Sequence, residues 1–149
     1  MKAFALVGVA LMLVLAGCGD DDDTSEESSE SVELPAEAAD ALAAYSQATA
    51  VDRDGEAMLA VVTEDFTFLS VGDTVLDRDA YAAEVDGYVD DFAVENLGED
   101  VVVGGGGTYI VSRSNTVSGG GFDSTGFSVF RLVDSDGEWL VDAHRFTGD

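Results

Sequence analysis

The chain has 149 residues, and its 31 acidic side chains against 6 lysines and arginines give a formal net charge of −25. A field of that sign repels nucleic acids, anionic lipid headgroups and phosphate-rich substrates, and leaves cations, cationic partners and neutral apolar ligands as candidates. The chain has one cysteine and one histidine. It therefore offers no Cys/His cluster for zinc or iron, and we expect neither a metal nor another cofactor.

The amino-terminal residues predict where the protein is located. Lys2 precedes an uncharged stretch, 3–17, which fits the apolar region of a signal peptide and is shorter than the roughly 20 residues of a membrane-spanning helix. The stretch ends in Leu15-Ala16-Gly17-Cys18, which resembles the lipobox of bacterial lipoproteins. The resemblance implies that residues 1–17 are removed and that Cys18 carries fatty acids such as palmitate, which anchor the protein on the extracytoplasmic face of the cell membrane. The alternatives are an ordinary secretory signal with an incidental cysteine, or an uncleaved anchor.

Residues 18–34 are expected to form an acidic, disordered tether. The run from Asp20 to Asp23 is followed by a segment of Thr, Ser and Glu. Such a segment buries too little apolar surface to offset the entropy of ordering it, and its charges repel one another. We therefore expect a single folded domain, over residues 35–149, which packing alone must stabilise.

The first half of this domain predicts helices. Apolar residues spaced for one helical face predict three of them, over residues 36–51, 56–62 and 78–89. Pro35 suits the first turn of the first helix, and Asp77 suits the N-cap of the third. An alternating segment, 66–71, predicts a strand that ends in a turn at Gly72-Asp73.

The second half of the domain predicts strands, over residues 92–97, 101–103, 108–118, 122–133 and 138–146. The four glycines 104–107 lack the Lys and Ser or Thr of a phosphate-binding loop, so a hairpin connection is expected there. Asp134-Ser135-Asp136-Gly137 predicts a tight hairpin turn. Helices followed by an antiparallel sheet give an α+β domain with the helices on one face of the sheet.

The order of these elements carries a family resemblance. A helix with Tyr45, a second helix, Thr63-Glu64-Asp65-Phe66-Thr67-Phe68, and Leu76-Asp77-Arg78-Asp79-Ala80-Tyr81 opening a third helix follow one another. This order resembles the NTF2-like superfamily, which includes the SnoaL-like polyketide cyclases and the ketosteroid isomerases, over about residues 36–147. The resemblance implies an NTF2-like cone, in which a curved antiparallel sheet and about three N-terminal helices enclose a pocket. Pairing as a homodimer through the outer face of the sheet, which is common in this superfamily, stays open.

The resemblance also allows a comparison with the isomerase residues. Tyr45 matches the tyrosine that donates a hydrogen bond to the developing oxyanion. The proton-abstracting aspartate falls near Ser70, and the protonated oxyanion-hole aspartate falls near Ser128. A serine without a partner base cannot abstract a carbon-bound proton at neutral pH, so isomerase chemistry is not expected.

The last predicted strand leaves its orientation open. Asp142 and His144 lie two residues apart and share a face with Leu140 and Phe146. The resemblance implies that this face lines the pocket, whereas Trp139, Val141 and Ala143 form the more apolar face, which patterning alone would assign to the core. We follow the resemblance. Arg113 and Arg131 are expected to pair with acidic residues on the outer face of the sheet.

We hypothesise a surface-anchored lipoprotein whose NTF2-like domain is a non-enzymatic small-ligand-binding or protein-interaction module. The alternative is a SnoaL-like acid–base enzyme, a cyclase, isomerase or dehydratase, in which Asp142 and His144 act as a pair with an oxyanion contact from Tyr45. The expected partners are the membrane, through Cys18, and a small apolar ligand, and no nucleic acid. The residues expected to line the pocket are Tyr45, Ser70, Ser128, Asp142, His144 and Phe146.

Overall fold

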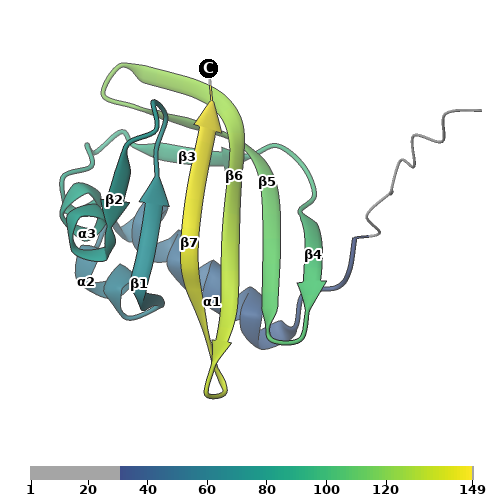
Figure 1. Cartoon of the computed structure of the whole chain (residues 1–149). Coiled ribbons are helices and arrows are strands. Elements are labelled where there is room, and N and C mark those ends of the chain that lie inside the picture. The colour runs from purple at the N-terminus through teal and green to yellow at the C-terminus, as the bar shows by residue number, and fades with distance from the viewer. Residues whose placement is uncertain (1–30, 149) are drawn as a thin grey trace, which may run out of the picture.

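The computed structural model describes residues 31–148. Its helices are α1 (Ala36–Ser46), the π-helix η1 (Gln47–Asp52), α2 (Gly55–Leu59) and α3 (Arg78–Asp86). Its strands are β1 (Val62–Leu69), β2 (Val75–Asp77), β3 (Ala93–Asn96), β4 (Val101–Gly105), β5 (Thr108–Gly119), β6 (Phe122–Ser135) and β7 (Glu138–Gly148). The expected α+β class is confirmed, and Figure 1 shows α1 lying across one face of the sheet with α2 and α3 beside it at the β1–β2 end.

The helix starts follow local capping chemistry. The carboxylates of Asp54 and Asp77 each accept a hydrogen bond from a backbone N–H three residues later, at 2.9 Å, which satisfies one of the free donors of the first turn. The break before α2 occurs at Arg53, which has a left-handed φ of 54°. The second helix is shorter than expected and ends at Leu59, because the chain joins the sheet at Val62, opposite Val141.

The sheet has seven strands in the order β2-β1-β7-β6-β5-β3, and β4 pairs with the other half of the same edge of β5. All pairs are antiparallel except β1 and β7, which run parallel. The sheet is therefore mixed, because the long stretch of chain between β1 and β7 lets the last strand enter in either direction. The sequence patterns missed β2, a strand of three residues that follows the expected turn at Gly72-Asp73.

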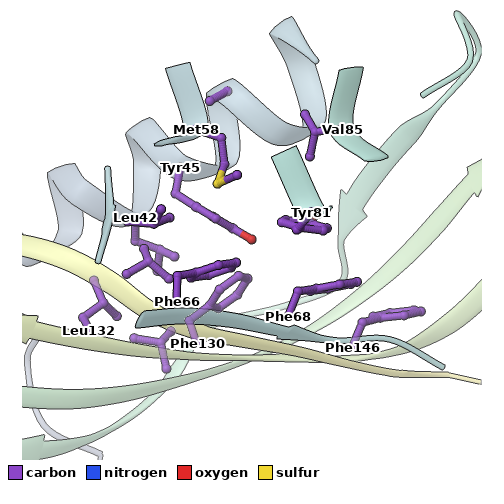
Figure 2. Packing of buried hydrophobic residues seen from close by; sticks show 14 of the residues in the cluster. Leu42, Tyr45, Met58, Phe66, Phe68, Tyr81, Val85, Phe130, Leu132 and Phe146 are labelled. Carbon is purple, nitrogen blue, oxygen red and sulfur yellow. The ribbon is translucent and has the colours of Figure 1, made fainter. Parts of the chain in front are cut away.

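The core lies between the helices and the concave face of the sheet. Tyr45 on α1, Met58 on α2 and Val85 on α3 are at most 1% exposed, and they meet the aromatic side chains of β1 and β6. Figure 2 shows Phe66, Phe68, Phe130 and Phe146 pointing from the strands toward Tyr45 and Tyr81. The helix face that apolar spacing predicted is thus the face that packs on the sheet.

Residues before the expected domain boundary contact the folded domain. The N–H of Val32 donates to the carbonyl of Val102 at 2.9 Å, the N–H of Val102 donates to the hydroxyl of Ser31, and Leu34 packs against the core. The carboxyl-terminal end of the predicted tether therefore covers the outer edge of β4. Cys18, the predicted signal peptide and the rest of the tether lie outside the described residues. Within residues 31–148, no helix has the length and apolar character needed to cross a membrane.

Candidate functional site

A cavity of about 680 Å³ opens between the concave face of the sheet and the helices. Aromatic side chains contributed by both layers form much of its wall, among them Tyr45, Phe68, Tyr81, Phe130 and Phe146. The aromatic rings pack on one another, and the rings of Phe68 and Tyr81 are stacked with centroids 4.1 Å apart. A cavity of this size and lining is typical of a site for a small organic molecule.

The structure brings five of the six expected pocket residues to this cavity. Its walls include Tyr45, Ser70, Ser128, His144 and Phe146. Asp142 does not line it. The carboxylate of Asp142 instead accepts a hydrogen bond from the hydroxyl of Thr63 at 2.9 Å and pairs with Arg131, whose side chain is 53% exposed.

A β-bulge at Asp142 explains this separation. Val141 lies opposite Leu132, but Ala143 lies opposite Arg131, so Asp142 is an extra residue without a partner on β6. An extra residue reverses the alternation of side chains along a strand. Val141 before the bulge and His144 after it consequently both face inward. The expected Asp142–His144 pair is wrong for this reason, because two-residue spacing places side chains on one face only in a regular strand.

A line of hydrogen bonds crosses the cavity wall at His144. The hydroxyl of Tyr45 lies 2.9 Å from Nδ1 of His144, and the hydroxyl of Ser128 lies 3.2 Å from Nε2. The side-chain amide of Asn115 donates to the Ser128 hydroxyl at 2.8 Å. Four side chains from α1, β5, β6 and β7 are thereby linked, so the helix and the sheet are joined by polar contacts as well as apolar ones.

His144 is held neutral by its surroundings. Its ring stacks on Phe130 at a centroid distance of 4.4 Å and meets the ring of Tyr45 edge-on. Burial among these rings, followed by the positive charge of Arg113, lowers the pKa of His144 to about 3. The imidazole is therefore uncharged at neutral pH, with one nitrogen acting as a donor and the other as an acceptor.

The surrounding groups favour one tautomer. The single proton of the Ser128 hydroxyl needs an acceptor, and Asn115 already donates to that oxygen. We therefore assign Nε2 of His144 as the acceptor of the Ser128 proton and Nδ1 as the donor to the hydroxyl of Tyr45. Burial raises the pKa values of Tyr45, Tyr81 and Tyr88, so these hydroxyls also stay protonated at neutral pH.

An ion pair lines another part of the cavity. Arg113 donates from Nε and from Nη2 to the two carboxylate oxygens of Asp100, each at 2.7 Å, and its guanidinium lies over the ring of Phe130 at 5.7 Å. The expected outer-face position is therefore wrong for Arg113, whereas Arg131 does pair with Asp142. The bidentate pairing satisfies both charges within the protein.

Sequence reasoning missed Asp100, Arg113 and Asn115 as cavity residues. A signal for two of them was present. Arg113 and Asn115 follow Val111 at two-residue spacing and precede Val117, so all four residues fall on the inward face of β5. Asp100 lies in a loop, where no periodicity indicates a direction. Among the described residues, no group of three or more His, Cys, Asp or Glu side chains could hold a metal ion.

Neither a protein-family model nor a curated protein matches the chain. Solved structures do. A candidate ketosteroid isomerase from Shewanella frigidimarina has 12% identity and a TM-score of 0.64, covering 76% of this chain and 96% of its own. An NTF2-like protein from Cytophaga hutchinsonii has 17% identity and a TM-score of 0.63, covering 74% and 94%. A candidate scytalone dehydratase from Novosphingobium aromaticivorans has 15% identity and a TM-score of 0.59, covering 74% and 80%.

These similarities establish the fold. The protein has an NTF2-like α+β fold, in which a curved mixed sheet of seven strands packs against three α-helices. The fold class that the sequence predicted is confirmed. Because one fold hosts many activities, the function must be argued from the cavity itself.

Proposed function

We propose that this domain binds a small, uncharged and predominantly apolar molecule in its cavity and does not transform it. The observation that carries the proposal is the open volume of about 680 Å³, which combines aromatic walls with neutral hydrogen-bonding groups around His144. Aromatic walls favour an apolar body, and a few fixed polar groups orient it. A cone filled by side chains would instead have favoured a protein-interaction role for the outer face of the sheet.

The electrostatics support an uncharged ligand. The strongly negative net charge disfavours anions, and the guanidinium of Arg113 is already paired with Asp100. The cavity wall also includes Val51, Val71 and Phe122, which are 61%, 46% and 50% exposed. These exposed side chains give an apolar molecule favourable contacts as it enters.

Acid–base catalysis is the weaker alternative, because the expected catalytic pair of Asp142 and His144 is not assembled. Asp142 is engaged with Thr63 and Arg131. A histidine with a pKa of about 3 binds a proton too weakly to act as an efficient general base at neutral pH, since the best catalytic pKa lies near the working pH. Ser70 and Ser128 do not replace the isomerase carboxylates, because a hydroxyl needs a base to activate it.

The location predicted from the amino-terminal residues belongs to the same proposal. Acylation of Cys18 would hold the cavity near the outer surface of the membrane, where apolar molecules are concentrated. Membrane fractionation of the full chain and metabolic labelling with an alkyne-bearing fatty acid test it. Label and membrane association are expected for the native chain and absent for Cys18→Ser; label retained in Cys18→Ser would contradict acylation at that sulfur.

Binding itself is tested with the neutral fluorescent probe N-phenyl-1-naphthylamine. A saturable rise in fluorescence is expected for the native protein. Ala43 and Ala44 are adjacent exposed residues of α1, but only Ala43 lines the cavity. Ala43→Trp should therefore weaken binding by about tenfold or more by filling space, and Ala44→Trp should not. Equal effects of the two variants, or no saturable signal, would contradict the proposal.

A further inference from the structure

One polar atom of the cavity wall has no partner among the described residues. The side chain of Asn115 is 3% exposed, and its Nδ2 donates to Ser128. Its Oδ1 accepts no hydrogen bond. A buried carbonyl oxygen left unpaired is costly in the free protein.

The position of Asn115 explains why this oxygen stays free. Asn115 lies on the inward face of β5, directly opposite Gly126 on β6. Gly126 has no side chain to cover the amide, and a Cβ there would lie 1.8 Å from the carbonyl oxygen of Thr147. The close approach of β7 therefore requires glycine at this position, so the residue opposite Asn115 has no side chain that could donate a hydrogen bond to the buried Oδ1.

The neighbouring groups do not supply a donor. The Ser128 proton is directed at His144 in the tautomer assigned above, and Arg113 donates from two of its nitrogens to Asp100. The buried hydroxyl of Ser124 on β6 has no hydrogen-bond partner, so it does not donate to Asn115, and Ser124 does not line the cavity.

From this geometry we infer that Asn115 Oδ1 is the polar contact for the ligand, and that the ligand is an apolar molecule carrying a hydroxyl or N–H group that donates to it. This inference rests on the proposed function and specifies its ligand class. An ether or a ketone of the same shape has no proton to donate and leaves the oxygen unpaired. The site should reject such analogues, because an unpaired buried acceptor loses affinity.

Three ligands of similar shape test this directly, with isothermal titration calorimetry on the full chain. They are 2-naphthol, its methyl ether 2-methoxynaphthalene, and the ketone 2-acetylnaphthalene. The native protein should bind 2-naphthol about tenfold more tightly than either analogue, as expected for one hydrogen bond to a buried acceptor. This comparison needs no variant, so it stands even if substitutions at Asn115 prevent folding.

Substitutions then assign the preference to one atom. Asn115→Leu should reduce the tenfold preference to about one while the methyl ether still binds, and the control Ser124→Ala should keep the native preference. Equal native affinities for all three ligands would overturn the inference and leave the proposed function intact. Preference for the ketone would overturn it by showing that the amide presents its nitrogen. If none of the three binds, the proposed function fails and the inference fails with it.

Discussion

His144 and Asp142 lie two residues apart on β7, yet His144 lines the cavity while Asp142 contacts Thr63 and the half-exposed side chain of Arg131. The bulge at Asp142 separates them. His144 is thereby paired with neutral groups, the hydroxyls of Tyr45 and Ser128, in place of a carboxylate. A carboxylate beside the ring would favour the imidazolium, whereas these neutral partners and the apolar rings leave it uncharged.

The neutral state of His144 predicts a specific pH dependence of stability. Its pKa is about 3 in the folded protein, against an ordinary value of 6.5. Between these pH values the unfolded chain binds a proton that the folded chain does not. The stabilising contribution is therefore complete above about pH 6.5 and is lost as the pH falls toward 3, by up to about 1.4 kcal/mol per pH unit.

Urea unfolding of the native protein and of His144→Gln, at several pH values between about 4 and 7, measures this contribution. The difference between the two free energies of unfolding should shrink as the pH falls, because the variant lacks the titrating group. As this is the only histidine in the chain, its imidazole NMR signals give a direct check. They should stay in the neutral form at pH 5, and a midpoint near 6.5 would show that the ring is not desolvated.

The contact between Tyr45 and His144 should appear as a coupling free energy. Tyr45→Phe leaves Nδ1 of a buried ring without its partner, which should destabilise the fold by about 1–3 kcal/mol. His144→Phe keeps a ring that can stack on Phe130. A double-mutant cycle of these two substitutions should give a coupling of about 1–2 kcal/mol. Additive effects would mean that the two side chains do not interact in solution.

Asp142 should contribute to the stability of the fold and not to ligand affinity. Asp142→Asn removes the ion pair with the partly exposed Arg131 and should lower the free energy of unfolding by about 1 kcal/mol or less. Probe affinity should change by less than about twofold, as it should for the exposed control Glu138→Gln on the same strand. A marked loss of probe affinity, or a shifted His144 NMR signal, would restore the pairing that the two-residue spacing suggested.

Gly126 should tolerate no side chain. Its added Cβ would lie 1.8 Å from the Thr147 carbonyl oxygen on β7, whereas a Cβ on Gly98 would meet no atom within 4 Å. Thermal and urea unfolding should therefore show Gly126→Ala destabilised by about 2 kcal/mol or more, because backbone must move. Gly98→Ala should be close to neutral. Equal stabilities would mean that β6 and β7 are farther apart than the structure has them.

The fold was largely predictable from local patterns. Asp77 begins a helix because its side chain caps a free N–H, and the glycines at 119–121 join two long strands because they adopt positive φ values. These causes act over a few residues and can therefore be recognised in the sequence. The helix predicted over residues 56–62 is shorter in the structure. Its end depends on the pairing of Val62 with Val141, about eighty positions away, which local patterns do not show.

The sequence by itself determined the charge, the α+β class and the residue types that the cone would contain. The family resemblance carried by the sequence also brought Tyr45, Ser128 and His144 into consideration, whereas patterning alone assigned the opposite face of the last strand to the core. Only the tertiary structure decided how these groups combine. A single unpaired residue on β7 reverses the side-chain alternation, and the close approach of β7 requires glycine at Gly126, opposite Asn115, whose buried Oδ1 has no hydrogen-bond partner. Both effects arise from contacts between strands, which the periodicity of one strand cannot encode.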